Sequence, residues 1–176
     1  RGWIDALLGR IVDIIMAIPQ IILALVVLAV LGVSLTTLAG TMIVIEATLF
    51  YRVLRPSAGE IAAMDFMEVA RLRGEGTLWI LRREMLPILM PTVIAEFGIR
   101  FAYAALFISA LSFLGVGIQP PAADLGGLVR ENALAITSGR MTPLVPAFAI
   151  ALIALAVNGL VDAMVRRYSL RAEIVK

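Results

Sequence analysis

Four stretches of this sequence are long and apolar enough to cross a lipid bilayer as helices. A bilayer core needs about 20 mostly apolar residues in a helix, and the stretches run approximately over 8–31, 35–53, 88–116 and 144–165. Over the chain, 61% of residues are apolar and 16% are charged, whereas soluble domains have about 45–50% and about 25%. We therefore expect an all-α, polytopic membrane protein in a single transmembrane domain, 1–176, and not the buried helical core of a soluble protein.

Pro19 interrupts the first stretch, in which every residue from Ile21 to Leu31 is apolar. Proline removes a backbone hydrogen-bond donor and clashes with the preceding turn of a helix. We expect a kink in the first span at this point. Gly32 and Ser34 then indicate a tight turn into the second span.

The basic residues are distributed unevenly between the connecting segments. Twelve of the fifteen lie in segment 52–87 or near the two ends, two lie in segment 117–142, and Arg100 lies within the third stretch. Cytoplasmic loops of membrane proteins carry an excess of Lys and Arg. We therefore expect both ends and a loop over 54–87 to be cytoplasmic, and a loop over 117–142 to be extracytoplasmic.

The residue types that the chain lacks exclude most catalytic chemistry. It has no Cys and no His, and its single Lys is Lys176. Thiol nucleophiles, imidazole bases, thiolate or imidazole metal sites and an internal P-loop lysine are therefore excluded. We expect no catalytic, cofactor-binding or metal-ligating residue in this chain. Any ATP and Mg²⁺ would be bound by a partner subunit, and a net charge of +2 gives no indication of a nucleic-acid partner.

The loop over 54–87 combines charged residues with apolar residues at helical spacing. Met64, Met67 and Leu72 belong to one such pattern, and Gly74 separates it from a second pattern that includes Leu78. This arrangement predicts short amphipathic helices outside the membrane. Such a helix could dock in the groove of a partner protein.

The same loop contains Glu68, Ala70 and Gly74, followed by Leu86 and Pro87. With these separations it resembles the EAA loop in permease subunits of binding-protein-dependent ABC importers. The family pattern is E-A-A, three residues, G, nine residues, an apolar residue, one residue, then L-P, and this chain departs from it at Val69 and Glu84. The resemblance implies a helix that couples the permease to its ATPase through these residues: Glu68, Val69, Ala70, Arg71, Leu72, Arg73, Gly74, Leu86 and Pro87. From the residue types we expect Val69, Ala70 and Leu72 to form its small apolar face.

A second motif is similar to the S-F-L-G-x-G-x-Q-P-P signature of the dipeptide and oligopeptide branch. It begins at Ser112 and contains Gly115, Gly117, Gln119, Pro120 and Pro121. Asn158 and Asp162 also match that branch, near the end of the last span. The resemblance covers nearly the whole chain and implies that one or two N-terminal spans are absent from it.

The resemblance implies a permease that imports di- or oligopeptides across the bacterial inner membrane. Its implied partners are a second permease subunit in a heterodimer, two ABC ATPases that bind ATP and Mg²⁺, and an extracytoplasmic peptide-binding protein. Relatives that move nickel, opines or glutathione are an alternative. A channel or a structural membrane scaffold is an alternative of another class, but neither needs a coupling loop.

Charged residues within the expected spans are candidates for a function. Glu96 and Arg100 are four residues apart with the acid first, which favours an ion pair along a helix. Glu46 in the second span could share Arg100. The pair could line the solute path or sense a conformational change, or it could simply lock the third span to a neighbour.

Small residues recur along another face of the third span. They are Ala95, Gly98, Ala102, Ala105, Ser109 and Ser112. Such a stripe lets helices approach closely in lipid, so we expect helix packing here, for which a partner permease is one candidate, and lining of the solute path is the alternative. In the outer loop, Leu125, Leu128, Val129 and Leu134 predict a short amphipathic helix.

Overall fold

The computed structural model describes residues 2–119 and 121–174, with side chains as far as Tyr168; Pro120 and Lys176 lie outside the described residues. Within them all regular structure is helical and there is no strand, which confirms the all-α prediction. The elements are α1 Trp3–Ala17, α2 Gln20–Leu31, α3 Leu35–Ala62, α4 Asp65–Leu72, α5 Thr77–Ile80, a π-helical turn η1 Leu81–Met85, α6 Leu86–Phe113, α7 Leu125–Asn132, a 3₁₀ helix η2 Ala133–Ser138 and α8 Leu144–Ile174.

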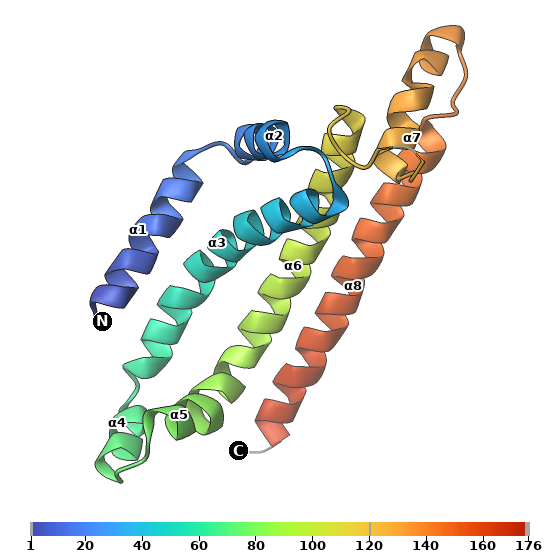
Figure 1. Ribbon diagram of the computed structural model, residues 1–176. Helices are drawn as coiled ribbons and strands as arrows, with labels where there is room; N and C mark the ends of the chain where they lie inside the picture. The colour runs from blue at the N-terminus through green and yellow to red at the C-terminus, as the bar shows by residue number, and fades with distance from the viewer. Residues whose placement is uncertain (1, 120, 175–176) are drawn as a thin grey trace.

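Among the described residues, three helices are long and apolar enough to cross a membrane: α3, α8 and the continuous helix Thr77–Phe113 that contains α5, η1 and α6. In Figure 1 they lie side by side, with α6 between α3 and α8. The short helices α4 and α5 lie at one end of these long helices, and α7 lies at the other end. A fourth span is possible only if α1 and α2 count as one broken span.

The first expected span is not one kinked helix, because α1 and α2 meet at an angle of 90°. Ile18 has φ −91° and ψ 129°, and Pro19 has φ −53° and ψ 126°. A residue before proline is pushed out of the helical region by the proline ring. Two consecutive residues are therefore extended, and this breaks the helix where a single proline would only bend it.

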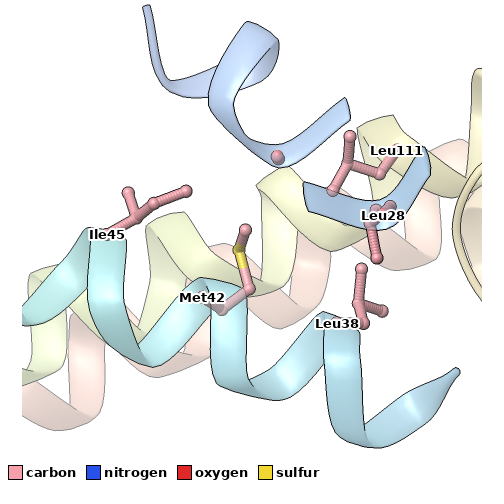
Figure 2. Packing of buried hydrophobic residues seen from close by; sticks show 6 residues of the cluster. Leu28, Leu38, Met42, Ile45 and Leu111 are labelled. Atoms are coloured by element: carbon pink, nitrogen blue, oxygen red, sulfur yellow. The ribbon is translucent and has the colours of Figure 1, made fainter. Parts of the chain in front are cut away.

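The helix α2 packs against the start of α3 and the end of α6. Figure 2 shows Leu28 of α2 beside Leu38 and Met42 of α3, with Leu111 of α6 close by. All of these side chains are almost completely buried. This cluster explains why the apolar helix α2 folds back over the bundle instead of continuing straight from α1.

The stripe of small residues on α6 packs against α8 of the same chain. A Cβ atom added at Gly98 would overlap the side chain of Val161. Further along, Ala102, Ala105 and Ser109 face α8 residues that include Val157. A helix of this chain, α8, therefore covers this part of the stripe.

Gly98 allows this contact, so Gly98→Ala should force α6 and α8 apart. Overpacking of this kind costs about 1–3 kcal/mol, and we expect a lower melting temperature for the detergent-solubilised full-length protein, followed by circular dichroism. Gly40→Ala on α3 is the matched control, because a Cβ there meets nothing within 4 Å. The control should be neutral or stabilising, since Ala favours helix by about 1 kcal/mol over Gly.

Adding Val161→Ala to Gly98→Ala removes the two methyl groups that the new Cβ would overlap. We expect the double variant to regain much of the lost stability. Equal melting temperatures for Gly98→Ala and Gly40→Ala would contradict the close contact.

Candidate coupling surface and intramembrane charge cluster

The helix α4 has one face buried against its own chain. Met67 and Ala70 are 1% and 0% exposed, and they pack with Ile61 of α3, Ile80 of α5 and Leu89 of α6. This small core holds α4 at the end of the two long helices. Ala70 therefore cannot belong to an apolar face offered to a partner, and that part of the prediction is wrong.

The opposite face of α4 is exposed and carries both apolar and charged side chains. Val69 is 52% exposed and Leu72 is 81% exposed. Charged residues surround them, so the face has an apolar centre with a polar rim. We name it the coupling face, and its members are Glu68, Val69, Arg71, Leu72 and Arg73.

Gly74 ends α4 in a left-handed conformation, with φ +79°. The Gly74 N–H donates to the Arg71 carbonyl at 3.0 Å, and the Glu75 N–H donates to the Ala70 carbonyl at 3.3 Å. These two bonds form a Schellman motif, in which glycine is preferred because a Cβ disfavours positive φ. The expected break at Gly74 is confirmed, and it places Leu72 and Arg73 at the tip of α4.

Leu86 and Pro87, the end of the loop motif, lie where the π-helical turn passes into α6. Proline has no N–H, so Pro87 cannot bond to the carbonyl four residues earlier. The N–H of the residue before it, Leu86, donates to the Leu81 carbonyl, five residues earlier, which is the π-helical pattern. Beside this turn, Glu84 lies 3.5 Å from Arg73. Glu84, one of the two residues that depart from the family pattern, thus has Arg73 of the coupling face as its partner.

Glu46, Glu96 and Arg100 come together between α3 and α6. The Arg100 Nε donates to Glu96 Oε1 at 2.6 Å, and a terminal nitrogen of Arg100 lies 3.9 Å from Glu46 Oε2. The expected pairing of Arg100 with Glu96, and its sharing with Glu46, is therefore present. We call these three residues the charge cluster.

The outer-end signature builds a tight loop. Gly115 has φ +89°, and a Cβ there would overlap the Arg130 guanidinium. The Gln119 side-chain amide donates to the carbonyls of Gly115 and Gly117, at 3.1 Å each, and the Ser112 hydroxyl accepts from the Ile118 N–H at 3.3 Å. Pro121 lies in the exposed turn that follows. These residues shape the connection from α6 to α7. The helix α7 is the start of the expected amphipathic segment.

Two polar features were not found from the sequence. Asp124 caps the start of α7 by accepting from the Gly127 N–H at 2.8 Å. Asp5 accepts two bonds of 2.8 Å from Arg55 and one of 3.3 Å from Tyr51, and so it joins α1 to α3. An Asp directly before the first apolar residue of a helix is a detectable cap signal, whereas a pair fifty residues apart has no local signal.

No group of three or more acidic side chains that could hold a metal ion occurs among the residues that the structure describes. The chemistry available here is docking at the coupling face and charge pairing between the helices. The long apolar helices are those of a polytopic membrane protein.

Comparison with known proteins identifies the family. Residues 1–173 match the model of the binding-protein-dependent transport system inner membrane component. The chain belongs to this family, a family of transport permease subunits.

Two named relatives are transport permeases, one for glutathione and one for dipeptides. The chain is 32% identical over 164 residues to the glutathione transport system permease protein GsiD of Escherichia coli, which covers 93% of this chain and 54% of that protein. It is 32% identical over 162 residues to the dipeptide transport system permease protein DppC of Alkalihalophilus pseudofirmus, covering 92% and 53%. The chain thus spans about half the length of the curated relatives it matches.

Arg100→Met tests the charge cluster, because it leaves two carboxylates without their cation. We expect a loss of stability of about 3 kcal/mol, measured by thermal unfolding in detergent. Adding Glu96→Gln should restore part of the lost stability by removing one unpaired charge. Normal stability and normal transport in the single variant would leave the ion pair without an essential role.

Proposed function

We propose that this chain is the permease part of an ATP-driven importer of peptides across the bacterial inner membrane. The observation that carries the proposal is the coupling face, an exposed apolar patch with a charged rim on a helix whose other face packs against its own chain. Membership of a binding-protein-dependent transport family supports it. The names of the dipeptide and glutathione relatives support a peptide-like solute.

In this proposal, the coupling face docks in a groove of an ABC ATPase, which binds ATP and Mg²⁺. Two ATPases and a second, different permease subunit complete the transporter, and an extracytoplasmic binding protein delivers the peptide. The side that carries α4 and both ends of the chain is cytoplasmic, as the distribution of basic residues predicts. Loop 117–142 then lies on the outer side.

Glutathione is the second candidate solute, because the GsiD name assigns it to a relative. Glutathione is itself a short peptide, so both candidates require the same kind of path. A channel or scaffold would have no use for an exposed coupling face.

Leu72→Glu tests docking directly. Leu72 is 81% exposed, so the change should leave the fold intact while placing a charge at the centre of the coupling face. We expect loss of co-purification of the ATPase with the permease complex. Leu134→Glu is the matched control, because Leu134 is 80% exposed at the opposite end of the bundle. Retained ATPase in Leu72→Glu would contradict the docking role.

Gly74→Val tests whether the end of α4 transmits ATPase movement. A β-branched residue at positive φ costs about 1–2 kcal/mol, so the tip of α4 should rearrange. We expect ATP hydrolysis to continue in the assembled transporter while solute uptake falls. Gly74→Asn, which tolerates this conformation, should keep uptake. Unchanged uptake in Gly74→Val would count against this role.

A further inference from the structure

A groove of about 350 Å³ opens between α3 and α6. The groove is lined by two charged residues, Glu46 and Arg100, and otherwise by apolar residues. Three of the apolar residues are Phe50, Phe97 and Phe101. Arg100 is about 200° around α6 from Gly98, at 100° per residue. The groove therefore lies on the side of α6 that faces away from α8.

The groove lies at mid-depth of the two helices that form it. Arg100 is thirteen residues from the outer end of α6, and Glu46 is eleven residues from the outer end of α3. At 1.5 Å per residue these positions are about 20 Å and about 17 Å along the helices. Charged residues at such a depth face a protein interior or a water-filled cavity and not lipid.

The charge cluster contains two carboxylates and one guanidinium, so its ionised groups sum to one negative charge. Arg100 forms its close hydrogen bond with Glu96, while its contact with Glu46 is 3.9 Å long. Within the described part of the chain, Glu46 Oε2 is buried and has no hydrogen-bond partner. Because this oxygen accepts no hydrogen bond within the described residues and meets Arg100 only at 3.9 Å, its burial is costly, and the arrangement favours a second cation beside Glu46.

We infer that this groove binds the ammonium group of a peptide-like solute, with the Glu46 carboxylate as its counter-ion. The inference rests on the proposed transport function and names the group that the path recognises. A free peptide carries an ammonium group at neutral pH. Phenylalanine rings attract such a cation through their faces, and three of them line the groove beside Glu46. Arg100 remains paired with Glu96 and holds the second carboxylate away from the solute.

The experiment uses the full-length permease in its complete transporter, reconstituted in proteoliposomes with the ATPases and the binding protein. The probe is dialanine, and uptake is measured with ATP present. Glu46→Gln should lower dialanine uptake about tenfold or more, the scale of one lost charge-assisted hydrogen bond. Glu46→Asp, which keeps the charge, should retain more uptake than Glu46→Gln.

Glu46→Gln is a mild change for the fold, because the close Arg100–Glu96 bond does not involve Glu46. Complex assembly, measured as the amount of ATPase that co-purifies with the permease, should therefore be retained. Glu60→Gln is the matched control, since it makes the same change on an exposed position of α3. Its uptake should equal that of the wild type.

A second probe separates recognition of the amine from a structural role. The amide of N-acetyl-dialanine is uncharged, so its uptake should be nearly the same in Glu46→Gln and wild type. The binding protein's own preference cancels when each probe is compared between the two permeases. An equal fall for both probes, or wild-type dialanine uptake in an assembled Glu46→Gln complex, would overturn the inference.

Failure of the proposed function would look different. In that case the wild-type transporter would import neither dialanine nor glutathione, whatever residue is present at position 46. If the wild type imports either peptide and Glu46→Gln takes up dialanine normally, the ammonium site is overturned while the proposed function stands.

Discussion

The close contact of α6 with α8 at Gly98 determines what the remaining faces of α6 can do. Because a glycine stands where any side chain would overlap Val161, the two helices approach closely along the small-residue stripe. Dispersion and close packing drive helix association in lipid, where no hydrophobic effect operates between helices. The opposite side of α6 is then turned toward α3, and it carries Arg100 and the groove. A single packing contact thus separates a structural face from a face with charges.

The continuous helix Thr77–Phe113 also connects the two ends of the molecule. Its start packs beneath α4 through Ile80 and Leu89, and its middle carries Glu96 and Arg100. A rigid helix of this kind can carry a displacement from one end to the other. The π-helical turn η1 changes its hydrogen-bond pattern near the start, and Pro91, which has no N–H, removes one bond further along. Movement of α4 would therefore reach the charge cluster through α6 itself.

Much of the fold could be predicted because its signals are local. The long helices follow from apolar runs, the Glu96–Arg100 pair from a spacing of four, and the end of α4 from Gly74. The complete break at Pro19 could not be predicted, because it depends on the extended conformation of Ile18 as well. The burial of Ala70 was missed for another reason. An eight-residue helix with apolar residues on two sides does not reveal which side its own chain covers.

Long-range polar contacts also could not be predicted from the sequence, and these contacts matter most for the charge cluster. Nothing in the spacing of Asp5 and Arg55, or of Glu84 and Arg73, indicates that each pair meets. For Glu46 the sequence suggested a shared cation, but only the structure shows that Arg100 bonds closely to Glu96 and contacts Glu46 at longer range. This asymmetry changes the meaning of the cluster. An evenly shared arginine would satisfy both carboxylates about equally, whereas an arginine committed to Glu96 leaves Glu46 available to a cation that enters the groove.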